Sequence, residues 1–230
     1  MFATGIYRGV SEINAAMGRV YFHMMTAVLN SMLVSYVIGT NHELSHFFLT
    51  GAMHWVVLFA PLAAIFIISP ALNSNPPAPV AIGMLHVFAA LMGLSLSAIF
   101  IVYAMTSIFT AFMGAAVLFG VMSVFGYFTK RNLDNMGAYL LIALIAIIIA
   151  SIINLFIGST VMQMVISAIA IIIFLGFTAY DTQQIREMVS VEYESSVAVE
   201  VSGALTLYLD FINLFVNLLQ IIGVSPGSDD

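Results

Sequence analysis

One carboxylate stands inside an apolar segment: Asp210 in LTLYLDFINLFVNLL, residues 205–219. An ionised carboxylate near the middle of a membrane costs about 2.5 to 3.5 kcal/mol on insertion scales. A proton, a cation, a basic side chain or an aqueous cavity would neutralise or solvate it. Lysine and arginine occur only outside the apolar segments or at their edges, so no internal basic partner is expected.

A second acid, Asp181 in GFTAYDTQQIREM, ends the preceding apolar segment. Both acids approach the same side of the membrane from consecutive segments, with Asp210 roughly 14 Å from its segment's start at about 1.5 Å per residue. Two carboxylates within a few ångströms of each other share a proton and titrate as a coupled pair. The sequence therefore predicts a pH-responsive acid pair if the two side chains meet.

Polar residues continue along the last apolar segment at spacings of 4, 4, 3, 4 and 3: Ser202, Thr206, Asp210, Asn213, Asn217 and Gln220. These spacings place them on one face of an α-helix. Thr206, Asn213 and Asn217 are candidates for supporting the aspartates or lining a pore. Asp181 and Asp210, with amide, hydroxyl and water oxygens, would form a weak calcium site, because calcium prefers oxygen ligands.

A different chemistry is suggested by NHELSHFF, in which His42, Glu43 and His46 form an H-E-x-x-H pattern. On a helix this pattern binds zinc with the glutamate as general base, which would indicate a zinc hydrolase. A third ligand is evident only as His54 or a distant acid. We favour the alternative, polar residues in a short loop, and expect no enzymatic activity.

The helices that position these residues can be predicted from the composition and from the apolar runs of the chain. Of the 230 residues, 62% are hydrophobic and 7% are charged, and the mean hydropathy is +1.11. A soluble domain would carry about 25% charged residues. Apolar runs of membrane-spanning length occur at about 19–39, 52–69, 80–103, 108–128, 136–157, 161–180 and 201–223. We predict an all-α polytopic membrane protein, with residues 1–230 as one domain of seven transmembrane helices.

Two connections between the segments are longer than the others. The proline-rich residues 69–80 predict a stiff non-helical turn, and the polar residues 181–200 either connect two helices or continue the sixth. The chain has no cysteine, which excludes disulfides and thiolate metal sites.

Orientation follows from the basic residues, which concentrate in cytoplasmic connections. With seven spans and a cytoplasmic N-terminus, all five lie inside: Arg8, Arg19, Lys130, Arg131 and Arg186. The C-terminal residues SPGSDD then lie outside. This pattern predicts the cytoplasmic (inner) membrane of a bacterium.

The segments around the two aspartates, LTLYLDFINLFVNLL and GFTAYDTQQI, resemble the transmembrane Bax inhibitor motif family, especially its bacterial branch. Residues 93–103 and 125–137 add to the similarity. The resemblance implies a last helix surrounded by six others, a paired Asp181 and Asp210 near the cytoplasm, and a pH-sensitive calcium leak. The second span ends without a basic residue, so Arg186, about one turn beyond Asp181, is the nearest cation for a basic latch on the pair.

The leading hypothesis is a calcium leak channel gated by protonation of Asp181 and Asp210. It requires no cofactor; its partners are the lipid bilayer, calcium as the permeant ion, and protons, and no nucleic acid. The alternative is an interaction protein that modulates membrane-protein quality control or cell death through an unidentified membrane partner.

Overall fold

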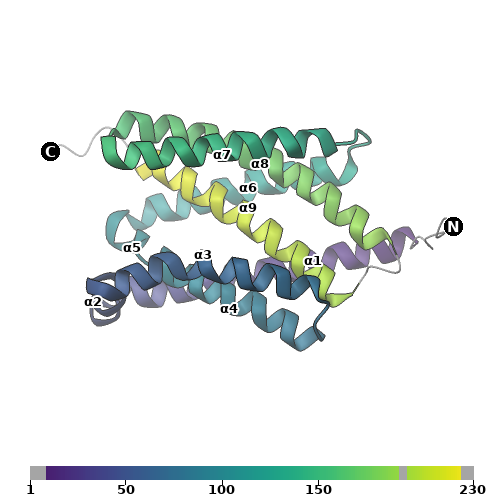
Figure 1. The fold of residues 1–230 in the computed structure, drawn as a ribbon, viewed down its shortest axis with the longest axis horizontal. Coiled ribbons are helices and arrows are strands. Elements are labelled where there is room, and N and C mark those ends of the chain that lie inside the picture. Colours follow the sequence, from purple (N-terminus) through teal and green to yellow (C-terminus); the bar gives the residue numbers. More distant parts are fainter. Residues whose placement is uncertain (1–8, 192–195, 224–230) are drawn as a thin grey trace. The chain divides into compact units, whose positions relative to one another are not determined.

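The computed structural model describes residues 9–191 and 196–223, which fold into nine α-helices (Figure 1). Arg8 and the SPGSDD segment lie outside the described residues. The helices are α1 (Val10–Thr40), α2 (His42–Leu49), α3 (Gly51–Asn73), α4 (Ala78–Leu96), α5 (Ile99–Val102), α6 (Met105–Phe128), α7 (Asp134–Ile157), α8 (Thr160–Ser190) and α9 (Val197–Gly223).

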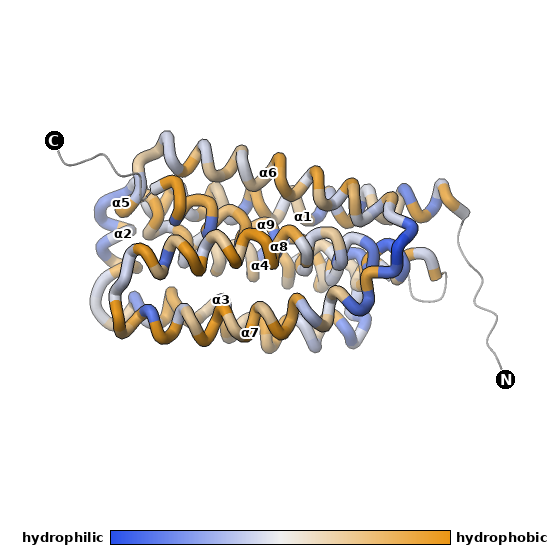
Figure 2. The backbone as a smooth tube through the Cα atoms, turned by 90° about the horizontal axis from the view of Figure 1, so that it is seen from above, coloured by the Kyte–Doolittle hydropathy of each residue, from blue (hydrophilic) through white to orange (hydrophobic). Residues whose placement is uncertain are grey.

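Seven helical segments are long and apolar enough to cross a membrane, and each contains one predicted span; α4 and α5 together form the third. Figure 2 shows hydrophobic residues along α3 and α7 and hydrophilic residues mostly at helix ends. Large apolar side chains such as Phe66, Leu155 and Phe156 are 73%, 81% and 85% exposed, which suits contact with lipid rather than water. The prediction of an all-α polytopic membrane protein is confirmed.

The proline-rich connection is shorter than predicted. Helix α3 continues through Pro70 to Asn73, and α4 begins at Ala78, so only residues 74–77 lie between the helices. Asn75 adopts a left-handed backbone with φ of 55°, a conformation that asparagine tolerates better than most residues. The predicted non-helical turn is therefore present, but over residues 74–77 rather than 69–80, because α3 accommodates Pro70 and α4 begins at Ala78.

The sixth span also extends further than predicted, because α8 runs to Ser190. Polar residues after Asp181 therefore continue the helix, and Asp181 lies within α8 rather than at its end. Gly158 ends α7 with φ of 70°, a left-handed conformation suited to glycine, and allows the chain to turn into α8.

The chain divides into two compact units. Unit 1 comprises Met1–Tyr103 and Ile185–Tyr208, which include α1 to α5 and the first part of α9. Unit 2 comprises Ala104–Gln184 and Leu209–Asp230, which include α6, α7, most of α8 and the rest of α9. The interpretation of residues 1–230 as a single domain stays a prediction.

Small residues bring helices together in each unit. In unit 1, α4 packs against α1 where a Cβ on Gly93 would lie 2.5 Å from the Ser31 carbonyl oxygen. In unit 2, a Cβ on Gly126 of α6 would collide with the Ala179 backbone of α8. The second contact fixes α8 two residues before Asp181.

Helix α9 is the most buried of the candidate spans. Half of its most apolar window is buried, compared with 6% to 28% for the other six. This burial agrees with the predicted central position of the last helix.

Candidate functional site: a buried aspartate pair

Asp210 occupies a buried position on α9, where its side chain is 5% exposed. Neighbouring Leu207, Phe211 and Leu214 are buried as well, at 0%, 4% and 0%. The apolar residues therefore pack on the faces that flank Asp210. Asp210 can keep this position only if its charge is removed or balanced.

The carboxyl groups of Asp181 on α8 and Asp210 on α9 form a hydrogen bond with each other within unit 2. An ionised carboxylate only accepts hydrogen bonds, so this contact requires a proton on one of the two groups. A pair held in this contact would carry one negative charge in place of two. The structure brings together the two acids that the sequence singled out, while their role as a gate stays a prediction.

One carboxyl oxygen of the pair, Oδ2 of Asp210, is buried and has no hydrogen-bond partner among the described residues. Leaving a buried polar atom unsatisfied costs about 1 to 3 kcal/mol. Contact with a cation would satisfy this oxygen, whereas protonation would remove charge but leave an O–H group that still needs an acceptor.

The helical segment that follows Asp181 is tied to the connection between α6 and α7. Oε1 of Gln183 accepts a hydrogen bond from the Leu133 backbone N–H at 2.9 Å, and Nε2 of Gln183 donates to the Arg131 carbonyl at 2.9 Å. The Thr182 and Ser123 hydroxyls lie 3.1 Å apart. Sequence reasoning missed these positioning contacts, although an unbroken run of polar residues after Asp181 was a signal of tertiary hydrogen bonding.

The three predicted supporting residues bond to their own helix. Thr206 Oγ1 donates to the Ser202 carbonyl at 3.2 Å, Asn213 Nδ2 to the Leu209 carbonyl at 2.8 Å, and Asn217 Nδ2 to the Asn213 carbonyl at 2.8 Å. These contacts do not bring them to the aspartate pair. Their support or pore role stays a prediction.

The predicted calcium site stays a prediction as well. Within the described ranges, no three or more histidine, cysteine, aspartate and glutamate side chains group together to hold a metal ion. Arg186 lies on the part of α8 that belongs to unit 1, and its role as a latch is likewise an untested prediction.

The H-E-x-x-H stretch is helical, so its assignment to a loop was wrong. Asn41 caps α2, because its Oδ1 accepts hydrogen bonds from the backbone N–H groups of Glu43 and Leu44 at 3.0 Å each. His42 and His46 line a pocket of about 410 Å³ in unit 1. With no third metal ligand grouped with them among the described residues, the zinc-hydrolase hypothesis gains no support.

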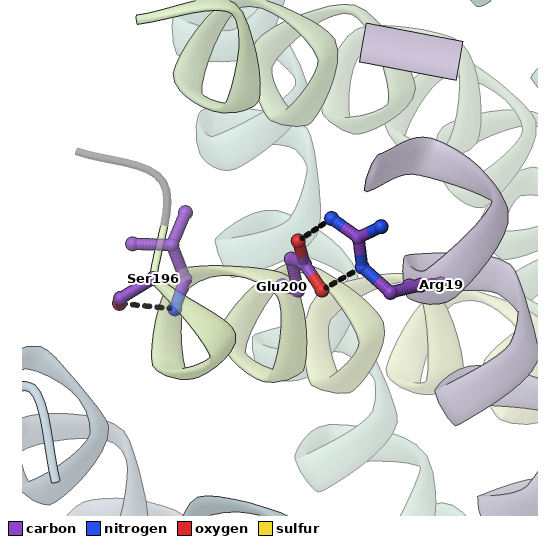
Figure 3. Close-up of polar contacts among 4 residues, drawn as sticks. Arg19, Ser196 and Glu200 are labelled. Atoms are coloured by element: carbon purple, nitrogen blue, oxygen red, sulfur yellow. Dashed lines mark hydrogen bonds and ion pairs between the residues drawn. The ribbon is translucent and has the colours of Figure 1, made fainter. Parts of the chain in front are cut away.

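A second buried acid was missed. Glu200 on α9 is 3% exposed and accepts hydrogen bonds from Arg19 Nε at 2.8 Å and Nη2 at 2.5 Å (Figure 3). Helix α1 begins at Val10, earlier than the predicted span, so Arg19 lies inside the helix. The expectation that no lysine or arginine lies inside a span was therefore wrong, although it was made for Asp210 and Arg19 pairs with Glu200. Both residues lie at the edges of predicted spans, which was the available signal.

Comparison with known proteins assigns the family. Residues 13–227 match the model of the family described as inhibitor of apoptosis-promoting Bax1. The chain belongs to this Bax inhibitor family. It is 36% identical over 211 residues to the inner membrane protein YbhL of Escherichia coli, covering 90% of each chain. An uncharacterized membrane protein of Streptococcus pyogenes is 42% identical over 163 residues, covering 70% of each chain.

Family membership confirms the resemblance recognised around the two aspartates, and the matched residues 13–227 also include the first two spans. The relative in Escherichia coli is named an inner membrane protein, in agreement with the seven apolar helices of this chain. The chain is an integral membrane protein of the Bax inhibitor family.

Proposed function

We propose that this protein is a pH-sensitive leak channel for cations, with calcium as the main permeant ion and the Asp181–Asp210 pair as the gate. The observation that carries the proposal is the hydrogen bond between two carboxyl groups that lie inside a membrane-spanning bundle. A buried contact of this kind holds only while the pair retains its proton. A change of proton count therefore changes the contact between α8 and α9.

The gating step follows from electrostatics. With one shared proton, the pair joins α8 to α9 and carries a single charge. Loss of that proton leaves two like charges in a medium of low dielectric constant, where their repulsion is far stronger than in water. The two helices then separate, or a cation enters to balance the charge.

Calcium fits the donor atoms at this site. Hard divalent cations take carboxylate and amide oxygens as ligands, and conduction requires that they bind weakly enough to leave. The unpartnered Oδ2 of Asp210 is an oxygen of this type. We propose the same cytoplasmic-side location for the pair that the basic residues predict, with the N-terminus inside and the C-terminus outside a bacterial inner membrane.

The direct test is calcium flux into dye-loaded proteoliposomes from about pH 5 to about pH 9, the range in which coupled acids titrate. Asp210→Asn and Asp181→Asn are compared with wild type. Each carboxamide donates to the remaining carboxylate at every pH, so both variants should lose the pH dependence. Asp134→Asn, which removes an exposed acid of unit 2, is the matched control and should behave as wild type.

Flux that is absent from wild type, or identical in all four proteins at every pH, would contradict the proposal. The alternative of a regulatory interaction with another membrane protein would then be pursued by capture of a cross-linked partner.

A further inference from the structure

A second polar cluster lies in unit 2, at the end of α7 away from the aspartate pair. Gln220 Oε1 on α9 accepts hydrogen bonds from Gln163 Nε2 at 2.8 Å and from Ser167 Oγ at 2.6 Å, both on α8. Gln163 Oε1 in turn accepts from Asn154 Nδ2 on α7 at 3.2 Å. We name these four residues, Asn154, Gln163, Ser167 and Gln220, the amide cluster.

The amide cluster is buried to a large degree and closely connected. Ser167 is 0% exposed and Asn154 is 6% exposed. Asn154 Oδ1 also accepts from the Ser159 backbone N–H at 3.2 Å, which fixes the turn between α7 and α8. The three helices are thus joined side chain to side chain at this point, in a region where lipid-facing residues offer no competing hydrogen bonds.

The aspartate pair and the amide cluster lie apart along α8 and α9, and toward opposite ends of α7. Near the pair, Gln184 on α8 donates to Asp134, at the start of α7. The amide cluster contains Asn154, near the end of α7. Along α9, Asp210 and Gln220 are separated by roughly 15 Å at about 1.5 Å per residue.

Two asparagines lie between them on the same face of α9. Asn213 and Asn217 use their Nδ2 atoms to donate to carbonyls of their own helix. Their Oδ1 atoms accept no hydrogen bond from any described residue. Each asparagine therefore retains an amide oxygen, the type of ligand that calcium takes from side-chain amides.

We propose that the amide cluster is a second constriction of the cation pathway, on the side of unit 2 away from the aspartates, and that Asn213 and Asn217 carry the ion between the two. This inference rests on the proposed leak function and deepens it. A cation can pass the amide cluster only by displacing hydrogen bonds among Gln163, Ser167 and Gln220. Because asparagine, glutamine and serine do not titrate in water, this closure is independent of pH.

Substitutions at the two constrictions should therefore have different effects on the flux and on its pH dependence. Loosening the amide cluster raises the flux and leaves the midpoint of its pH dependence unchanged. Altering the aspartates changes the pH dependence itself. A merely structural role for the amide cluster predicts lower thermal stability without this separation.

The experiment measures calcium flux in proteoliposomes for Gln220→Ala, which removes the acceptor of two hydrogen bonds, and Ser167→Ala, which removes one donor. We expect a severalfold rise for the first, a smaller rise for the second, and the wild-type midpoint for both. Ser151→Ala is the matched control, because the Ser151 hydroxyl donates only to the Ile147 carbonyl of its own helix. It should match wild type. Thermal unfolding in detergent checks that each variant is folded.

A cross-link tests closure directly and does not depend on the variants' stability. The chain has no cysteine, so a Gln163→Cys and Gln220→Cys double variant carries only the two introduced thiols. A short bis-methanethiosulfonate reagent that bridges them should reduce the flux below that of wild type, and a reductant should restore it. Each single variant, treated identically, should not respond.

The results separate the two proposals. If wild type conducts and the aspartate variants alter its pH dependence, but the cross-link leaves the flux unchanged, the amide cluster is no constriction. A shift of the pH midpoint in Gln220→Ala or Ser167→Ala would also overturn the inference. Absence of flux from wild type would overturn the leak function and this inference together.

Discussion

Helix α9 carries two buried acids that are neutralised in different ways. Glu200 is 3% exposed in unit 1 and accepts two hydrogen bonds from Arg19, whereas Asp210 is 5% exposed in unit 2 and forms a hydrogen bond with another acid. Arginine stays charged at any physiological pH, so Glu200 has a cationic partner whatever the pH. Only the aspartate pair depends on a proton.

Burial alone does not make an acid respond to pH. The response depends on the group that the buried acid contacts. A guanidinium fixes the ionised state of its carboxylate and gives two aligned hydrogen bonds. A second carboxyl can join the first only by sharing a proton. Four predictions address this difference, from the largest expected effect to the smallest.

Arg19→Ala should have the largest effect on stability. It leaves the buried carboxylate of Glu200 without its partner, and an unsatisfied buried acceptor costs about 3 kcal/mol at most, because the Arg19 side chain is itself 51% exposed and water can reach the site. Urea or thermal unfolding in detergent measures the change. Arg131→Ala, which removes an exposed arginine from the connection before α7, should unfold as wild type does. Equal stability of the two variants would show that Arg19 contributes no more than a surface charge.

Gly126→Ala should destabilise the protein by about 2 kcal/mol, because the added methyl group collides with the Ala179 backbone and forces α6 away from α8. The same shift moves Asp181, two residues further along, so the pH dependence of the flux should change as well. Gly120→Ala is the matched control on α6, since a Cβ there meets no atom within 4 Å. If both variants behave alike, the close approach of α6 to α8 does not position the pair.

Asp210→Asn and Glu200→Gln each replace a buried carboxylate of α9 with a carboxamide. We expect about 1 kcal/mol of destabilisation for each, because a new donor or acceptor replaces part of the lost hydrogen bonding. Their effects on flux should diverge: the first removes the pH dependence, and the second retains it. If Glu200→Gln also lost the pH dependence of the flux, the aspartate pair would not be the group that alone controls it.

Gln184→Ala should have the smallest effect, within about 0.5 kcal/mol, because its hydrogen bond to Asp134 is exposed to solvent. Gln183→Ala should cost more, since it leaves the Leu133 backbone N–H without its partner in a buried position. Unfolding measurements on the two neighbouring variants compare them directly. A reversed order would mean that the exposed bond, rather than the buried one, fixes α8 beside the pair.

The sequence predicted the features that follow from a local spacing of residues or from a known motif. The spacing of polar residues placed Asp210 on one helix face, and the apolar runs located all seven spans. Sequence reasoning failed where the surroundings of a residue outweigh its local propensity, as at Pro70, which lies inside α3. It left open whether the residues after Asp181 continue the sixth helix, and α8 continues to Ser190. The Arg19–Glu200 pair joins residues 181 positions apart, for which no short-range pattern exists.

The contact between Asp181 and Asp210 also has an evolutionary consequence. A substitution of either acid leaves the other in an apolar environment without its partner. One substitution alone therefore lowers the stability of the protein, and a second substitution at the partner position can restore it. The same holds for Arg19 and Glu200, which lie 181 positions apart in the chain. The two positions of each pair should therefore covary, so that related sequences differ at both positions of a pair or at neither.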